Sequence, residues 1–193
     1  MKAFHGTTYE NFVNLMKGGD KPSGAWKASD CDGLFYIYPI DKMITEFLGL
    51  DDIIGVSADD YEEARQQGLF NALASGSFTA ALAMKTQKIV VLELEIPDEE
   101  LQNDWSCENM AHIASCVYGF DKNWIKNVHS SEFHAMYSPF FIPDLSNPYR
   151  NEFPEELEII VNCLGDGLYN TAEELRTILE DGLKIDNVLL NNI

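Results

Sequence analysis

The residues best suited to chemistry stand at the start of the chain, in the run Phe4-His5-Gly6-Thr7-Thr8. A histidine and a glycine follow a short apolar stretch here and precede a helix-start pattern, with Thr7 as the expected N-cap and Glu10 completing a capping box. His5 and Gly6 are therefore expected at a strand-to-helix turn, where ring nitrogens and a bare backbone amide can bind a ligand. Taken alone, such a pair is more often structural than functional.

The composition indicates one folded domain. The chain has 193 residues, of which 46% are hydrophobic, enough to bury a substantial core. Its apolar runs are far shorter than a membrane span, and its first residues lack the apolar centre of a signal peptide, so the protein is expected in the cytoplasm. The 4 cysteines are widely spaced, which favours small packing residues in a reducing compartment over a zinc ribbon.

The formal net charge of −19 is extreme for a chain of this size. A surface of that sign repels nucleic-acid backbones, so direct binding of DNA or RNA is disfavoured. The same charge would attract a basic protein, including one that itself binds nucleic acid. Plain solubility explains the charge equally well.

Hydrophobic periodicity predicts an α+β domain, because strands and helices do not alternate regularly along the chain. The clearest strand is 88–96, in which Glu93 and Glu95 are expected to face solvent. The other expected strands are 33–39, 132–137 and 157–161, and the expected helices are one following Thr7, 41–48, two within 58–85 separated near 74–77, two short ones within 98–127, and 172–181.

Three of these segments resemble, in their order and spacing, the ADP-ribosyltransferase family. His5-Gly6-Thr7 begins the chain, Gly33-Leu34-Phe35-Tyr36 opens a strand, and Ser131-Glu132-Phe133 opens another. The likeness is to the His–Tyr–Glu branch of the family, which is related to diphtheria toxin and the poly(ADP-ribose) polymerases. It extends over roughly residues 4–143. We therefore expect a transferase-like domain at 1–143 and an acidic C-terminal extension at 144–193, packed on the same domain.

The resemblance implies split antiparallel β-sheets flanked by helices, with an NAD+ cleft between the two halves. In that arrangement His5 would hydrogen-bond the adenosine-side ribose. Gly6 would offer its backbone amide and carbonyl groups to the nicotinamide carboxamide, and Thr7 would complete the NAD+-holding end of the cleft. NAD+ would be the substrate, with no metal or second cofactor needed.

The aromatic positions depart from the family pattern. The family's Gly-x-Tyr strand corresponds to the run from Gly33, but its strict tyrosine position holds Phe35, while Tyr36 lies on the other face. The helix at 41–48 would normally end in a second stacking tyrosine, and that residue is Phe47 here. Phenylalanine keeps the π-face needed to stack on nicotinamide. The sequence leaves open which aromatic side chain does the stacking.

Glu132 matches the family's catalytic glutamate, which opens a strand in a Glu-aromatic-x-x-x-aromatic setting. Cleavage of the nicotinamide–ribose bond generates an oxocarbenium-like ribose, and a carboxylate against the ribose hydroxyls stabilises that charge in the transition state. Glu93 and Glu95 are rivals, although their simpler interpretation is a solvated sheet face. The glutamates at 155–158 are a further set, better explained as part of a solvated acidic edge.

The leading prediction is a mono-ADP-ribosyltransferase that transfers ADP-ribose from NAD+ to a protein with a basic surface, as an effector acting in the cytoplasm. A catalytically inactive acidic binding or inhibitor protein on the same fold is one alternative, and NAD+ hydrolysis with water as acceptor is another. An RNA phosphotransferase is disfavoured by the shortage of basic residues. His112 and Cys116 have a spacing that could present both to a metal, yet no second pair follows, so no metal site is expected.

Overall fold

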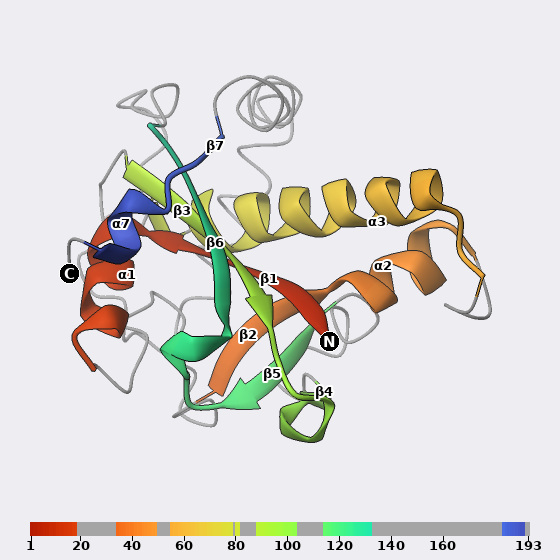
Figure 1. Cartoon of the computed structure of the whole chain (residues 1–193), viewed down its shortest axis with the longest axis horizontal. Coiled ribbons are helices and arrows are strands. Elements are labelled where there is room, and N and C mark those ends of the chain that lie inside the picture. Colours follow the sequence, from red (N-terminus) through yellow and green to blue (C-terminus); the bar gives the residue numbers. More distant parts are fainter. Residues whose placement is uncertain are drawn as a thin grey trace, which may run out of the picture.

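The computed structural model describes residues 1–18, 34–49, 55–78, 80–81, 88–103, 114–132 and 183–191 (Figure 1). These residues form an α+β fold, as the periodicity predicted, with one antiparallel sheet flanked by helices. The strands are β1 (Lys2–Thr8), β2 (Leu34–Pro39), β3 (Lys88–Glu95), β4 (Gln102–Asn103), β5 (Ser115–Tyr118), β6 (Ile125–Glu132) and β7 (Lys184–Ile185). The helices are α1 (Tyr9–Met16), α2 (Ile40–Phe47), α3 (Ala58–Asn71), the π-helix η1 (Ala72–Phe78), the single 3-10 turns η2 (Asp98–Glu100) and η4 (Lys122–Trp124), and α7 (Val188–Asn191).

The described sheet has the strand order β4-β5-β2-β1-β3-β6-β7, so β1 and β3 are central strands. β3 pairs with β1 on one side and with β6 on the other along nearly its whole length. Helices cover both faces of this part of the sheet, and the side chains from Ile89 to Leu92 are fully buried. This explains why β3 reads as an almost continuous apolar run.

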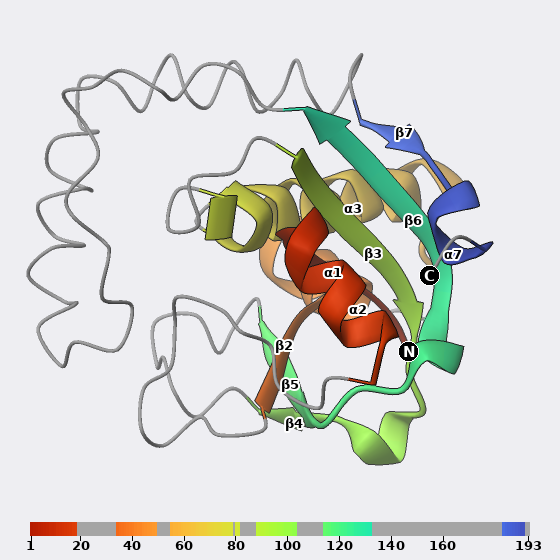
Figure 2. The ribbon, with the colours of Figure 1, turned by 90° about the vertical axis from the view of Figure 1, so that its left-hand side faces the viewer.

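The sheet divides between β1 and β2. These strands pair only at Ala3 with Pro39 and at Phe4 with Tyr38. Beyond these pairs β1 continues along β3, whereas β2 diverges and pairs with β5. Figure 2 shows the two strand groups, with β2, β5 and β4 on one side and β3, β6 and β7 on the other.

Helix α1 begins one residue later than predicted. Thr8, and not Thr7, is the N-cap, because Thr8 Oγ1 accepts a hydrogen bond from the Asn11 amide at 3.3 Å. Thr7 stays in β1, where it pairs with Val90. The helix ends at Met16, and Gly18 follows the C-cap with a positive φ of 82°.

Each face of the sheet has its own hydrophobic core. On one face α2, α3 and η1 cover the strands, and Phe4, Met43 and Leu73 are fully buried there. On the other face α1 packs through Phe12 and Leu15. Figure 2 shows α1 in front of β3, with α3 behind the sheet.

The predicted short helices within 98–127 are wrong for the described residues of that segment. Apart from the turns η2 and η4, these residues form β4, β5 and the beginning of β6. β5 has four residues, too few for a periodic signal, and its strand conformation comes from pairing with β2. Cys116 and Val117 are fully buried in this strand, so Cys116 is a packing residue as expected.

Several predictions fall outside the described residues. They are residues 133–137 of the strand predicted for 132–137, the strand at 157–161, the helix at 172–181, the domain boundary at 143, His112 and the glutamates at 155–158. Among the helices that the structure describes, none is long and apolar enough to cross a membrane.

Candidate functional site

His5 lies where β1 and β2 separate, within β1 and not at the predicted strand-to-helix turn. Its Nδ1 hydrogen-bonds the backbone carbonyl oxygen of Tyr36 in β2 at 2.6 Å. Its ring stacks on Phe35, with centroids 3.9 Å apart and planes inclined by 28°. Side-chain contacts of His5 therefore replace backbone pairing at the point where the sheet divides.

The contact with Tyr36 determines the tautomer of His5. A carbonyl oxygen can only accept, so Nδ1 carries the proton, and Nε2 of the neutral ring is a hydrogen-bond acceptor. Desolvation lowers the pKa of His5 to about 4, although the hydrogen bond to the Tyr36 carbonyl acts in the opposite direction. The imidazole is therefore neutral at physiological pH.

His5 is partly exposed, and the contact with Tyr36 occupies only one of its ring nitrogens. None of the described residues forms a hydrogen bond with Nε2. A hydroxyl group of a ligand could donate a hydrogen bond to it.

The aromatic candidates differ in exposure. Phe35 is only 1% exposed and lies between His5 and Phe120, whose ring centroid is 4.9 Å from that of Phe35. Tyr36 is partly exposed. Phe47 is the last residue of α2, and its side chain lies outside the described part of the structure. Phe35 therefore packs inside the protein, and Tyr36 is the described candidate with accessible surface.

Gly6 is covered by the π-helix η1. A Cβ atom at position 6 would lie 1.7 Å from the Ala72 carbonyl oxygen, and a Cβ atom on Gly76 would lie 2.5 Å from the Gly6 carbonyl oxygen. Ser77 of η1 also donates a hydrogen bond to the Val90 carbonyl oxygen at 2.7 Å. Only glycines at positions 6 and 76 allow η1 to pack this closely on β1.

The backbone polar groups of Gly6 point away from β3. Met1 and Ile96 exchange both backbone hydrogen bonds, and bonded pairs alternate along antiparallel strands. The β1 residues that bond β3 are therefore Ala3, His5 and Thr7, whereas Gly6 directs its N–H and C=O groups toward β2. β2 has diverged at this point, but Gly6 is buried beneath η1, which contacts its carbonyl oxygen through Gly76.

Glu132 was predicted to open a strand, and this prediction is wrong. β6 begins at Ile125, and Glu132 is its last described residue, opposite Lys88 of β3. The strand extends upstream because Val128 and His129 are buried against β3. The Glu132 side chain is exposed to solvent.

His5 and Glu132 lie on the same face of the sheet. His5 is opposite Leu92, which is opposite Val128, and alternate residues of a strand share a face. Lys88 precedes Leu92 by four positions and Glu132 follows Val128 by four positions, so both residues face the same way as His5. Standard strand spacings place His5 and Glu132 roughly 16 Å apart. At the Glu132 end, Lys88 Nζ lies 4.0 Å from the Tyr9 ring centroid at the start of α1.

Glu93 was predicted to face solvent, and this prediction is wrong. Its Oε2 accepts hydrogen bonds from Asn127 Nδ2 at 3.0 Å, His129 Nε2 at 3.3 Å and an Arg65 guanidinium nitrogen at 3.4 Å. The bond from His129, assisted by Asn127 and Arg65 and opposed by desolvation, lowers the pKa of Glu93 to about 2. Glu95 is exposed as predicted and pairs with Lys126 at 3.1 Å.

The Glu93 cluster (Glu93, Arg65, Asn127 and His129) lies on the opposite face of the sheet from His5. Glu93 is paired with Phe4, the neighbour of His5 along β1, and neighbouring residues of a strand point to opposite faces. Glu93 therefore cannot act on a ligand bound to the His5 side chain on its own face. Sequence reasoning missed this cluster, because Arg65 and Glu93 are brought together only when α3 packs on β3.

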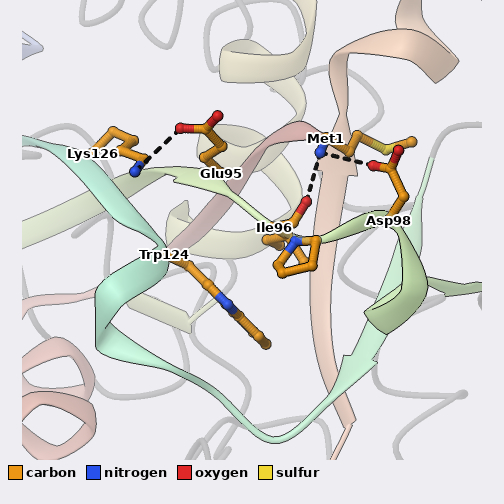
Figure 3. Close-up of a pocket in the computed structure, with 7 residues that line it drawn as sticks. Met1, Glu95, Ile96, Asp98, Trp124 and Lys126 are labelled. Atoms are coloured by element: carbon orange, nitrogen blue, oxygen red, sulfur yellow. Dashed lines mark hydrogen bonds and ion pairs between the residues drawn. The ribbon is translucent and has the colours of Figure 1, made fainter.

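A separate hollow of about 480 Å³ lies at the far end of β3. Figure 3 shows it between Trp124, the Lys126–Glu95 ion pair and Met1, whose amino group bonds Asp98. Apart from Glu95, one of the rival catalytic glutamates, its lining contains none of the predicted catalytic or NAD+-binding residues.

No family model matches the chain, and neither a curated protein nor a solved structure matches it significantly.

Proposed function

We propose that this protein is a mono-ADP-ribosyltransferase that uses NAD+ as the ADP-ribose donor. The observation that carries the proposal is the state of His5, a neutral and partly exposed histidine at the division of the sheet, whose Nε2 is an acceptor without a partner among the described residues. Glu132 lies on the same face and is exposed. These are the residues that resemble the family's ribose-binding histidine and catalytic glutamate.

The geometry of His5 suits a ribose. Nε2 would accept a hydrogen bond from a ribose hydroxyl, and the Tyr36 carbonyl keeps the ring in the tautomer that this requires. The separation of roughly 16 Å from Glu132 is too large for one small molecule to contact both residues. An elongated substrate such as a dinucleotide could reach both.

Glu132 would act at the reacting end of the substrate. The bond between the nicotinamide nitrogen and ribose C1′ breaks, and its electron pair leaves with neutral nicotinamide. The carboxylate stabilises the positive charge that develops on the ribose. A nucleophile of the target protein then bonds to C1′ and loses its proton to solvent. Water in place of that nucleophile would give NAD+ hydrolysis.

The charge of the protein supports a basic target. The formal charge is −19, and exposed carboxylates gather on α3 and η2 within the described residues. The acidic residues of α3 and η2 concerned are Asp59, Glu62, Glu63, Asp98, Glu99 and Glu100. A field of this sign increases the rate of encounter with a cationic surface.

A second candidate function is an acidic binding or inhibitor protein without transferase activity. Two observations favour it. Gly6 is packed against Gly76 of η1, and Phe35 is buried with its ring against His5. Both residues are thus occupied by the protein itself, where an active enzyme would use such positions to hold nicotinamide.

Incubation with labelled NAD+, with and without cell lysate, distinguishes these functions. Glu132→Gln should reduce label transfer and nicotinamide release by about 100- to 1,000-fold, because it removes a charge that stabilises the transition state. Glu95→Gln is the matched control, since Glu95 is an exposed strand glutamate on the other face, and its activity should equal that of the wild type. Release of free ADP-ribose alone would indicate hydrolysis. Failure of the wild type to bind or cleave NAD+ would leave the binding protein.

A further inference from the structure

We propose that residues 183–191 form a strap that fixes the position of β6, and that Asn187 is a positioning residue for Glu132. The part of this inference that concerns Glu132 rests on the proposed function. The strap consists of β7, α7 and the residues between them, and it lies along the outer edge of β6 (Figure 1).

The side chain of Asn187 takes the place of a strand backbone. Val128 of β6 donates its amide hydrogen to Asn187 Oδ1 at 2.9 Å, and its carbonyl oxygen accepts from the Asp186 amide at 2.7 Å. β7 itself pairs only through Lys184 and Ile185, so these two bonds extend the pairing beyond the end of β7. The outer edge of β6 is thereby closed near its middle.

Two further contacts hold the strap. Ser130 lies two positions before Glu132, and its Oγ donates a hydrogen bond to Asp186 Oδ2 at 3.2 Å. Leu189 is buried in the same core as Val128 and Phe12. The strap is therefore attached both to the strand that carries Glu132 and to the core beneath it.

Asn187 also determines the register of β6. Its Nδ2 donates to Asn127 Oδ1 at 3.1 Å, and Asn127 Nδ2 donates to Glu93 Oε2 at 3.0 Å. The pairing of β6 with β3 is irregular at this point, with a register shift between Glu93 and Leu94. A slip of one residue turns every side chain of a strand to the other face, and it would remove Glu132 from the face that carries His5. The chain of bonds from Asn187 to Glu93 opposes such a slip.

The test combines amide hydrogen exchange with steady-state kinetics on the full chain. In Asn187→Ala the amides of Ser130 to Glu132 should exchange about tenfold faster than in the wild type. The kcat for NAD+ cleavage should fall about tenfold with an unchanged KM, because the ribose-binding His5 is unaffected. Asn187→Asp keeps the acceptor for the Val128 amide, so its exchange rates and its kcat should lie between those of the wild type and those of Asn187→Ala. Asn191→Ala, an exposed position in the same segment, is the matched control and should behave like the wild type.

The outcomes separate the two proposals. Unchanged exchange in Asn187→Ala would overturn the strap. Faster exchange with unchanged kcat would overturn the positioning role of Asn187. If the wild type does not cleave NAD+, the proposed function and the role assigned to Glu132 are both wrong, and the exchange data alone decide whether the strap holds β6. If Asn187→Ala fails to fold, the comparison of Asn187→Asp with Asn191→Ala gives the same readouts.

Discussion

The polar groups on the two faces of the central sheet differ in how fully the protein itself satisfies their hydrogen bonds. On one face the carboxylate of Glu93 receives three hydrogen bonds on a single oxygen, two of them from His129 and Arg65. On the other face His5 makes one hydrogen bond to the described residues, to a backbone carbonyl, and none of those residues bonds its second ring nitrogen. A charge whose bonds are made within the protein contributes to stability, whereas an unused acceptor at an accessible position is suited to a ligand. The contrast indicates a role in stability for the Glu93 face and supports the proposal that a ligand binds on the His5 face.

The largest effect is expected when Glu93 is removed. Glu93→Ala should lower the free energy of unfolding by about 3–5 kcal/mol, because Arg65 loses its largely buried counter-charge and His129 loses its hydrogen-bond partner. Glu95→Ala removes a solvent-exposed ion pair with Lys126 and should cost less than about 0.5 kcal/mol. Urea unfolding at pH 7 measures both values. Equal losses in the two variants would show that the Glu93 cluster has no special role in stability.

A smaller loss is expected at Gly6. Gly6→Ala should destabilise the fold by about 3 kcal/mol, because its Cβ would overlap the Ala72 carbonyl and displace η1 from β1. Gly18→Ala is the control for backbone conformation. It meets no atom within 4 Å but requires a positive φ, so its cost should be about 1 kcal/mol. A wild-type melting temperature for Gly6→Ala would mean that η1 does not pack on β1 as described.

The two faces should lose stability in different pH ranges. The pKa of Glu93 in the folded protein is about 2, below its ordinary value of 4.5, so its contribution is complete above pH 4.5 and is lost as the pH falls toward 2. Between pH 7 and pH 3 this loss amounts to about 2 kcal/mol. Glu93→Gln should lack this part of the acid transition.

His5 affects the stability of the protein in a higher pH range. Its pKa falls from 6.5 to about 4 on folding, so its contribution is complete above pH 6.5 and is lost between about pH 6.5 and pH 4. His5→Phe, which retains an aromatic ring against Phe35, should lack this higher part alone. Unfolding curves collected at intervals of pH for both variants and the wild type would resolve the two ranges. A single shared range would contradict the separation of the two faces.

The smallest effect concerns ligand binding. His5→Ala should weaken NAD+ binding about tenfold, or about 1.4 kcal/mol, by removing one hydrogen bond to a ribose hydroxyl. Wild-type affinity should stay constant from pH 8 to pH 5, because His5 is neutral throughout this range. Titration calorimetry at several pH values provides the measurement. An affinity that falls already near pH 6.5 would show that Nε2 is not the group that binds.

The sequence predicted most of the elements whose signals are local. β3 was evident as the clearest predicted strand, and α1 was expected as the helix that follows Thr7. The choice of N-cap was not local, because Thr7 and Thr8 can both cap. Thr7 pairs with Val90 in the sheet, which leaves Thr8 as the N-cap. The residues next to Thr7 in the sequence do not indicate this pairing.

The candidate site was predicted less well, for the same physical reason. His5 was recognisable as a residue, but its position depends on β2 leaving β1 to pair with β5. Glu93 looked like a solvent-facing residue of an alternating strand, because the sequence does not show that α3 brings Arg65 onto that face. Predictions made from spacing fail where a second layer of helix covers a strand face.

The closure of β6 by residues 184–187 has a consequence for biosynthesis. Every strand of the described sheet except β7 has left the ribosome by the time Glu132 has emerged, so the sheet can begin to form early. Among the described residues, however, none pairs with the outer edge of β6 until β7 and Asn187 have emerged. During this interval the nascent chain exposes an unpaired strand, which is the kind of surface that associates with other chains. Truncation before Lys184 should therefore yield a product that folds but aggregates.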